Sequence, residues 1–371
     1  MTLPIYADRL ARARAALAEA GTDALLLTPG ANLLYLTGFE PRYSGERLLA
    51  FILQRDGAAL WITPAMNQAE VEQSALPGQQ MRVWMDEEWH LPSLRDATAG
   101  LKTVAFDDET RAAFLLDLLA IAPEVRVGKA SGVMRGLRTC KDAAELAALR
   151  AAARTVDETI PEVLALCRPG RREMDVEEAL RGALRRHSPE SEVAFSIVAS
   201  GPNSALPHHH TGGRELRHGD VVVLDYGTRL RWYHSDITVT CTVGEPADPE
   251  VRKVYRSVWE AQQKALAAIR PGVACAAVDA AARESIRAAG YGEYFIHRTG
   301  HGIGLDVHEP PYLVAGNEEP LAEGMCFSVE PGIYLPGRFG VRLEVIATVT
   351  ASGVELLNAP SSPELLDALV G

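Results

Sequence analysis

Acidic residues set within apolar, strand-like segments constrain the fold of this chain more than any other feature. The run Val221–Leu224 leads into Asp225, and a second strand-like run begins at Asp236. If the two runs form a simple hairpin whose turn centres between Leu230 and Arg231, the two aspartates face each other. Opposed residues of this kind have their Cβ atoms about 5 Å apart. We therefore expect Asp225 and Asp236 to form a pair on one face of a sheet.

The same hairpin argument predicts a second pair of facing acids downstream. Glu330 and Glu344 are opposed if the hairpin between them turns at Gly337. Pro336 and Gly337 suit a turn, because proline fixes φ and glycine permits a positive φ. The sequence thus predicts two hairpins that each deliver two facing carboxylates.

Two pairs of buried acids repel each other and need a counter-charge. Four carboxylates and one imidazole, that of His301, would suit two divalent ions such as manganese. Sites of this kind hold the metals about 3.5–4 Å apart. The competing interpretation makes each acid a solvated surface charge. It accounts easily for one acid, but poorly for two matched pairs flanked by apolar strand residues.

Histidines cluster in two places, at 208–210 and at 297–308. The second cluster includes the glycine-rich run 300–304, where glycines let backbone approach a centre closely. Its spacing does not match a dinucleotide-binding fingerprint. Imidazoles can bind a metal or donate to a developing oxyanion. For His209 and His210 we expect ordinary polar roles, since a run of three needs only one functional member.

The first part of the chain has the pattern of an α/β domain. Apolar residues at helical spacing precede Gly21, and a buried strand is expected at 23–28. Segments 48–54 and 58–64 predict a hairpin, and a further strand and helix are expected at 103–107 and 109–122. The residues at helical spacing are Tyr6, Leu10, Ala13 and Leu17.

An Ala-rich helical stretch at 135–170 marks the change to a second domain. Thr139 or Asp142 would serve as its N-cap, and a second long helix is expected at 249–269. We place the boundary near residue 136, with domains at 1–135 and 136–371. Strand-like runs between and after the helices predict an α/β domain with an antiparallel sheet.

Composition excludes several classes of protein. A chain of 371 residues exceeds the usual size of a single core. The net charge of -12 argues against nucleic-acid binding. Five scattered cysteines without a CxxC pair argue against a disulfide scaffold or a zinc ribbon. No apolar run reaches the roughly 18 residues that span a membrane, and no secretory signal is evident, so we expect a cytoplasmic protein.

The motifs together resemble the pita-bread metallopeptidases (family M24), in the Xaa-Pro aminopeptidase and prolidase branch. Residues 23–39 resemble the creatinase-like N-terminal domain, and 137–150 resemble the helix that enters the catalytic domain. The resemblance implies an α/β (α+β) protein whose second domain has a curved, mainly antiparallel sheet. The motifs occur in the family's order and spacing: NSALPHH (203–209), LDYG (224–227), SDIT (235–238), HRTGHGIGLDVHE (297–309), EPGIY (330–334) and GVRLE (340–344).

The resemblance implies a role for each matched residue. The expected reaction is hydrolysis of the Xaa-Pro bond at a peptide's N-terminus by a hydroxide that bridges two metal ions, most suitably Mn, with Co or Zn as alternatives. Glu330 would also be the general base, and His208 and His308 would steady the tetrahedral intermediate. Substrate-side roles fall to His297, Arg342, Tyr312 and Tyr334. The implied metal ligands are Asp225, Asp236, His301, Glu330 and Glu344, with Asp236 and Glu344 bridging.

Three positions depart from the family pattern. Val239 stands where Arg is common and Val345 where Asp is common, and several prolidases carry Arg near Tyr312. Such arginines can engage a substrate carboxylate, so the choice between dipeptides and longer peptides stays open. The resemblance also implies a homodimer acting on small peptides with proline second. The alternatives are a creatinase, a methionine aminopeptidase, or an inactive peptide-binding scaffold.

Overall fold

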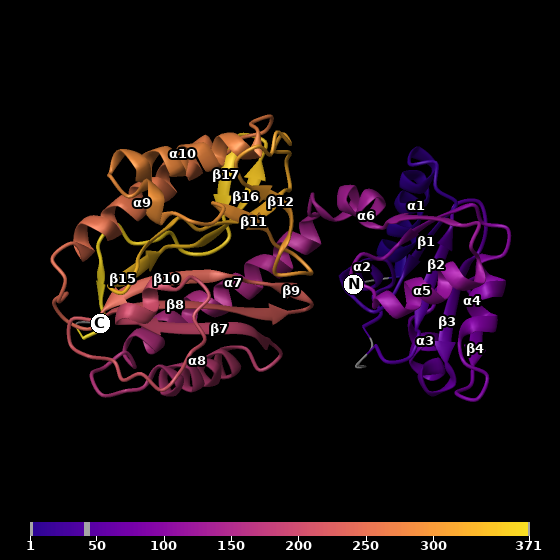
Figure 1. Cartoon of the computed structure of the whole chain (residues 1–371), viewed down its shortest axis with the longest axis horizontal. Coiled ribbons are helices and arrows are strands. Elements are labelled where there is room, and N and C mark those ends of the chain that lie inside the picture. Colours follow the sequence, from indigo (N-terminus) through magenta and orange to yellow (C-terminus); the bar gives the residue numbers. More distant parts are fainter. Residues whose placement is uncertain (1–2, 41–44, 370–371) are drawn as a thin grey trace. The chain divides into compact units, whose positions relative to one another are not determined.

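A six-stranded mixed sheet is the centre of the first of two units into which the chain divides, between Arg138 and Thr139. Figure 1 shows the computed structural model, which describes residues 3–40 and 45–369. The strands run in the order β4-β3-β2-β1-β5-β6, with bounds β1 Ala24–Leu27, β2 Ala50–Gln54, β3 Ala59–Pro64, β4 Gln80–Trp84, β5 Thr103–Phe106 and β6 Arg126–Lys129. The helices are α1 Leu3–Glu19, α2 Ala31–Thr37, α3 Gln68–Ser74, α4 Leu91–Thr98, α5 Ala112–Ile121 and α6 Ser131–Arg138, with a 3₁₀ turn η1 at Ala65–Asn67.

Local sequence signals of this unit are confirmed. The antiparallel hairpin β2–β3 pairs Ala50 with Ile62, and α1 buries the four residues that recur at helical spacing. All four residues of β1 are buried because neighbouring strands pair with both of its edges. The sheet therefore carries the core of the first unit.

The helical stretch expected at 135–170 is divided between two helices. Helix α6 ends at Arg138, and α7 (Ala143–Leu164) begins after Asp142. The Asp142 side chain accepts a hydrogen bond from the Glu145 amide at 2.8 Å, and the Glu145 side chain accepts one from the Asp142 amide at 2.9 Å. This capping box settles the N-cap at Asp142 rather than Thr139.

Two antiparallel-rich sheets and a short hairpin make up the second unit. The first sheet has the order β18-β10-β8-β7, with β9 paired to β8, and only β10–β18 is parallel among its described pairs. The second sheet has the order β12-β11-β13-β16-β17, and β14 pairs with β15. The strands are β7 Glu192–Ser200, β8 Val221–Leu230, β9 Tyr233–His234, β10 Ile237–Thr242, β11 Gly300–Gly302, β12 Glu309–Leu313, β13 Cys326–Val329, β14 Gly332–Leu335, β15 Phe339–Arg342, β16 Val345–Thr350, β17 Gly353–Leu356 and β18 Leu366–Asp367.

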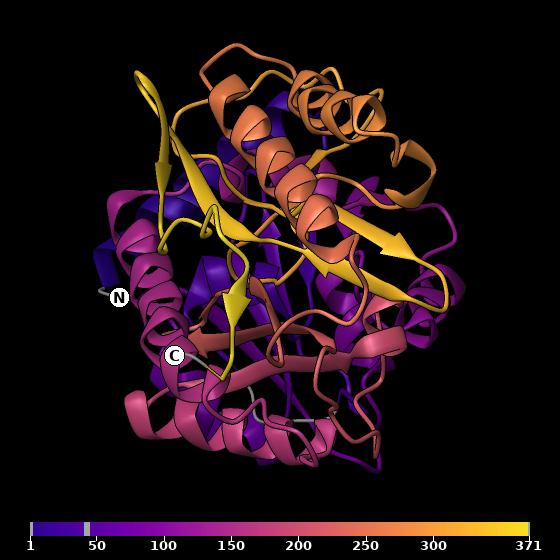
Figure 2. The same cartoon turned by 90° about the vertical axis from the view of Figure 1, so that its left-hand side faces the viewer.

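Helices cover the outer faces of these sheets (Figure 2). Helices α7 and α8 (Glu173–His187) pack on β8 and β7, whereas α9 (Val251–Ala268) contacts β13, β14 and β15. Helix α10 (Cys275–Ala288) packs against α9, and two 3₁₀ turns lie at Gly201–Ala205 (η2) and Gly292–Tyr294 (η3). The strands of the two sheets, and the residues next to them, carry most of the candidate site residues.

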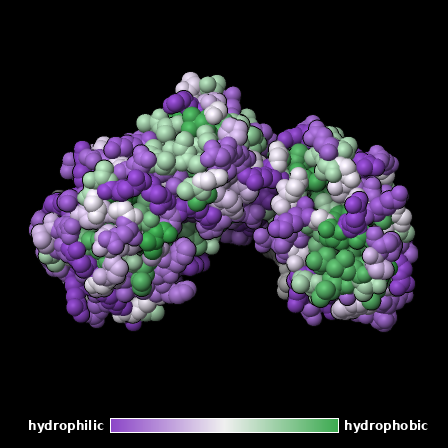
Figure 3. All heavy atoms as spheres, turned by 45° about the horizontal axis from the view of Figure 1, so that its top comes forward, coloured by the Kyte–Doolittle hydropathy of each residue, from purple (hydrophilic) through white to green (hydrophobic). Residues whose placement is uncertain are grey.

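Large apolar side chains are exposed mainly on the first unit. Figure 3 shows hydrophobic residues gathered on one of its faces. Those of this unit that are exposed are Met66, Val83, Met85, Trp89, Leu116 and Leu119. Among the described residues, no helix combines the length and the apolar character that crossing a membrane requires.

Candidate metal centre

Strands of both sheets, and the residues next to them, bring the predicted acidic residues and one imidazole together. Asp225 lies within β8, Asp236 directly precedes β10, and His301 lies in β11. Glu330 directly follows β13, and Glu344 directly precedes β16. Ligand atoms of Asp225, Asp236 and Glu344 lie within 4.8 Å of one another, and so do those of His301, Glu330 and Glu344. Glu344 belongs to both groups and joins them into one cluster.

The first predicted hairpin forms with a different register. Strand β10 pairs Thr238, not Asp236, with Asp225. The turn centres between Arg231 and Trp232, which have φ of 49° and 75°, as a two-residue hairpin turn of the primed type requires. The expected opposition of Asp225 and Asp236 is therefore wrong by two residues. A shift of two keeps Asp236 on the same face, so both carboxylates still enter the cluster.

The second predicted hairpin has the expected register. Tyr334 pairs with Gly340 above the turn, and Val329 pairs with Val345 further along. Glu330 and Glu344 therefore occupy opposed positions between these pairs. Gly337 has φ of 73° at the turn.

Burial and mutual repulsion dominate the electrostatics of the cluster. Burial raises the pKa of Asp236 well above its usual range, and the charges of Asp225 and Glu330 raise it further. Burial raises the pKa of Glu344 in the same way, with Asp236 and Glu330 adding to the rise. Burial also raises the pKa of Glu330. A bound cation would remove the repulsion among these carboxylates.

Two carboxylate oxygens of the cluster have no hydrogen-bond donor. Asp225 Oδ1 and Glu344 Oε1 are buried, and no described residue donates to either. Buried polar atoms without partners are rare in native proteins. Buried carboxylate oxygens without a hydrogen-bond donor, inside a group of acids, suit the coordination of a divalent metal ion.

The orientation of His301 fits the same donor set. Its Nδ1 lies 3.1 Å from the Gly302 carbonyl oxygen, which assigns the ring proton to Nδ1. Its Nε2 then points a lone pair at Asp236 Oδ2 and Glu330 Oε1, at 3.4 and 3.5 Å. Burial lowers the pKa of His301, which keeps the ring neutral. A lone pair that faces two carboxylates fits a cation bound between them.

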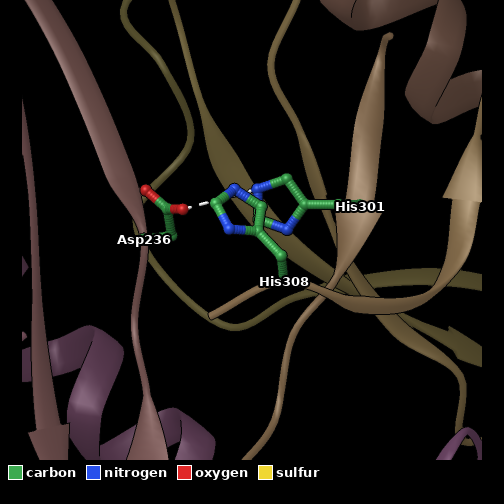
Figure 4. A group of neighbouring side chains, drawn as sticks. All are labelled: Asp236, His301 and His308. Carbon is green, nitrogen blue, oxygen red and sulfur yellow. Dashed lines mark ion pairs between the residues drawn. The ribbon is translucent and has the colours of Figure 1, made fainter. Parts of the chain in front are cut away.

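His308 approaches this cluster from its exposed side. Its ring centroid lies 4.1 Å from that of His301, and both rings lie beside Asp236 (Figure 4). Partial burial, His301 and Arg298 lower the pKa of His308 to about 4. His308 is therefore neutral at physiological pH and able to donate or accept a hydrogen bond at the mouth of the site.

Arg342 connects the acids to a second layer of side chains. Its Nη2 donates to Asp225 Oδ2, its Nη1 donates to Tyr334 Oη at 2.8 Å, and its Nε donates to Thr238 Oγ1 at 3.0 Å. Thr238 Oγ1 in turn donates to Glu344 Oε2 at 2.7 Å. Sequence reasoning missed Thr238, although strand alternation places it on the same face as Asp236.

His297 is fixed at both ring nitrogens. Its Nδ1 lies 2.7 Å from the Arg298 carbonyl oxygen, so Nδ1 carries the proton and Nε2 accepts from Tyr334 Oη at 2.9 Å. Burial and the charge of Arg342 lower the pKa of His297 to about 4. Tyr334, which was expected to bind substrate, is buried and reaches the site through His297 and Arg342.

The loop that carries His208 is held by a buried acid that sequence reasoning missed. Glu173 Oε1 accepts from the amide and hydroxyl of Ser200, each at 2.7 Å, and from Asn203 Nδ2 at 3.0 Å. Glu173 Oε2 lies 2.9 Å from His209 Nε2. His209 therefore has a structural partner, while His208 faces the site pocket.

A pocket opens over the acidic cluster. Its wall includes apolar side chains from β7 and from the His308 loop, as well as two arginines. Tyr312 and Tyr334 are not among the lining residues. Besides the five clustered residues, the lining consists of Phe195, Ile197, Pro207, His208, His297, Arg298, Val307, His308 and Arg342.

Comparison with protein families and curated relatives covers nearly the whole chain. Residues 147–351 match the model of metallopeptidase family M24, and residues 9–140 match that of the creatinase/prolidase N-terminal domain. A protein described as probable dipeptidase PepE from Mycobacterium tuberculosis is 45% identical, over 95% of this chain and 94% of its own. The Xaa-Pro dipeptidase of Pyrococcus horikoshii is 32% identical over 91% of this chain and 92% of its own.

Solved structures agree in fold over both units. The dipeptidase PepE from Mycobacterium ulcerans has a TM-score of 0.94 at 42% identity, and 99% of each chain is covered. A prolidase from Thermococcus sibiricus has a TM-score of 0.92 at 37% identity, covering 98% of this chain and 99% of its own.

Proposed function

The chain belongs to metallopeptidase family M24, and we propose that it hydrolyses the Xaa-Pro bond of dipeptides at a two-metal centre. The observation that carries this proposal is the convergence of four carboxylates and a neutral imidazole at the base of one pocket, with two buried oxygens to which no described residue donates. The names of the similar proteins support the dipeptide as substrate.

Five residues would hold the metal ions: Asp225, Asp236, His301, Glu330 and Glu344. Glu344 belongs to both groups of ligand atoms, and together with Asp236 it is proposed as a bridging ligand. The oxygen-rich set favours manganese, and the single imidazole leaves cobalt or zinc as alternatives. When bound, the metals would polarise the scissile carbonyl and lower the pKa of water.

Glu330 is the proposed general base. It is the least enclosed of the clustered acids, and its Oε1 accepts only a long hydrogen bond, at 3.3 Å, from the hydroxyl of Ser328. It would take a proton from the attacking water and pass it to the departing nitrogen. The nitrogen of an Xaa-Pro bond carries no hydrogen, so proline must gain a proton as it leaves.

His208 and His308 would steady the oxyanion from the open side of the pocket. Both line the pocket, and the lowered pKa of His308 leaves it neutral, as a hydrogen-bond donor at one nitrogen. Phe195, Ile197 and Val307 supply an apolar wall, which suits the pyrrolidine ring of proline.

A comparison of substrates with the manganese-loaded protein tests the proposal. Ala-Pro should be hydrolysed much faster than Ala-Ala, and the Glu330→Gln variant should bind metal but lose at least about 100-fold in kcat. Release of methionine from Met-Ala peptides in preference to Xaa-Pro cleavage would point to a methionine aminopeptidase. A metal-loaded protein that cleaves none of these peptides would refute the enzyme assignment.

The proposed assembly is a homodimer. The exposed apolar side chains of the first unit support it, because large apolar patches on soluble proteins commonly mark interfaces. The molar mass in solution, measured by light scattering, tests this part of the proposal.

A further inference from the structure

Gln262 is a buried polar residue on the mostly apolar inner face of α9. Its side chain is fully enclosed, although neighbouring positions on the same face are filled by small or apolar residues. Burying an amide among such residues costs free energy unless the amide is hydrogen-bonded. The apolar neighbours on this face are Val254, Val258, Ala261, Ala265 and Leu266.

The amide of Gln262 bridges two strand segments. Its Nε2 donates to the carbonyl oxygen of Val329 at 3.0 Å and to that of Leu343 at 2.9 Å. Val329 directly precedes Glu330, and Leu343 directly precedes Glu344. One side chain is therefore hydrogen-bonded to the backbone next to both acids that this hairpin brings to the metal centre.

The regular pairing of the hairpin is interrupted where these two acids lie. Strands β13 and β16 pair as far as Val329 and Val345, and β14 and β15 begin to pair at Gly332. Both acids fall in the interval between the two ladders. Within it, the Leu343 amide makes only a long hydrogen bond, at 3.4 Å, to the Pro331 carbonyl oxygen. The ladders alone therefore do not fix the backbone that carries the acids.

The amides of the two acids bond outside the hairpin, to different neighbours. The Glu330 amide donates to the carbonyl oxygen of Thr299 at 2.8 Å, beside β11. The Glu344 amide donates to the carbonyl oxygen of Thr238 at 3.0 Å, in β10. Gln262 links the two segments across the interval, so its hydrogen bonds bear on the spacing of the two acids.

Gln262 reaches the centre only through the backbone. No residue of α9 is among the described residues that line the pocket. The Oε1 atom of Gln262 is buried, and no described residue donates to it. An apolar residue would pack on this face without burying such an atom, so packing alone does not account for a glutamine.

We propose that Gln262 is a positioning residue of the metal centre: its amide sets the spacing of the backbone at Glu330 and Glu344 and thereby the affinity for the metal ions. This inference rests on the part of the proposed function that makes these acids metal ligands. Side chains that hold metal ligands in place commonly change metal affinity by about 10- to 100-fold when they are replaced. Because Gln262 acts through the backbone, we expect the lower end of this range.

A calorimetric titration of metal-free protein with manganese(II) tests the role. Gln262→Met keeps the approximate length of the side chain but removes both donors, and it should weaken manganese binding about tenfold. Gln263→Met is the matched control, because it makes the same substitution at the next, half-buried residue of α9. It should bind manganese as wild type does.

Steady-state kinetics at saturating manganese provide a second readout. Gln262→Met should lower kcat for Ala-Pro about tenfold, because small displacements of a catalytic group slow the reaction. KM should stay near the wild-type value, since the pocket wall is unchanged. A loss confined to KM would contradict the positioning role.

Ile286→Ala separates positioning from general loss of stability. Ile286 is buried on α10 in the same apolar core, so this variant should unfold at lower urea concentration yet keep its manganese affinity. If Gln262→Met does not fold, Gln262→Asn takes its place, because an amide one carbon shorter cannot bridge both carbonyls. It should weaken manganese binding in the same direction.

The outcomes distinguish this inference from the proposed function. Wild-type manganese affinity in the Gln262 variant, or an equal loss of affinity in Ile286→Ala, would overturn the inference and leave the proposed function standing. A wild type that binds manganese but cleaves no Xaa-Pro dipeptide would overturn the proposed function alone. A wild type that binds no manganese would overturn both.

Discussion

Glu173 and His209 join the second unit's helix α8 to the loop that carries His208. The two side chains meet at 2.9 Å, and Glu173 is fully buried. The same carboxylate accepts hydrogen bonds from Ser200 and Asn203 at the start of the loop. One buried acid therefore holds the segment 200–209, which carries His208 into the pocket lining.

Replacing Glu173 by Gln should weaken this loop. The amide keeps one acceptor oxygen but places a donor against the donors of the loop, which should cost about 1–3 kcal/mol in the free energy of unfolding. Because His208 loses its support, kcat/KM should fall about tenfold. Chemical denaturation and steady-state kinetics measure the two effects. Glu177→Gln is the matched control, since Glu177 lies one turn further on α8 and contacts Arg181 and Ser196 instead. Equal activity loss in both variants would contradict the assigned role.

Metal binding should stabilise the protein strongly. The clustered acids repel one another without a cation, and ligand binding to the folded state adds about 3 kcal/mol when free metal is about 100 times Kd. Asp236→Asn should remove this gain, while its metal-free form should be as stable as wild type or more so. Thermal unfolding with manganese and with a chelator measures this. Glu355→Gln, at an exposed ion pair with Arg150, should keep the full metal-induced shift. A full shift in Asp236→Asn would argue against the proposed centre.

Acid should destabilise the folded protein through His297. Its pKa is about 4 in the folded state against 6.5 for an unperturbed histidine. As the pH falls, the unfolded chain therefore binds a proton at His297 before the folded chain does. The stability that neutral His297 contributes is complete above about pH 6.5 and is lost as the pH falls towards 4, by about 3 kcal/mol. In metal-free protein, the stability difference between wild type and His297→Gln should thus change by this amount over that range. A constant difference would rule out the depressed pKa.

A buried ion pair supports the segment that follows His308. Lys141 Nζ lies 2.8 Å from Glu309 Oε1, and both side chains are buried. Lys141→Met should cost about 3–5 kcal/mol, because it leaves a buried carboxylate without its cation. Adding Glu309→Gln should restore much of this loss. Urea denaturation of the two single variants and the double variant completes the cycle, and additive losses would show that the two side chains act independently.

How far the sequence predicts the site depends on the turns. The pair Pro336-Gly337 fixes a turn through local conformational preference, so the register that opposes Glu330 and Glu344 was predictable. In the first hairpin, Arg231 and Trp232 adopt the positive φ that is usually left to Gly or Asn. No local signal marks that turn, and the predicted register was off by two residues.

Contacts over long sequence distances escaped prediction for a different reason. Glu173 lies 36 residues before His209, and nothing in either neighbourhood distinguishes it from a surface helix acid. Strands β4 and β6 were also missed, because most of their residues are exposed or half-exposed at the sheet edges and show no apolar alternation. Edge strands and buried acids are defined by the tertiary structure around them.

Glycines flank His301 for a reason that limits how this enzyme can change. A side chain at Gly300 would overlap the Ser328 carbonyl oxygen, and one at Gly302 would overlap the carbonyl oxygens of Glu309 and Pro310. Random mutagenesis should therefore recover almost no active variants at these two positions. Arg298 and Val307 line the pocket and already carry side chains. New substrate preferences, whether found by laboratory selection or by divergence of gene copies, are expected to arise from substitutions at pocket positions such as Arg298 and Val307, while Gly300 and Gly302 stay unchanged.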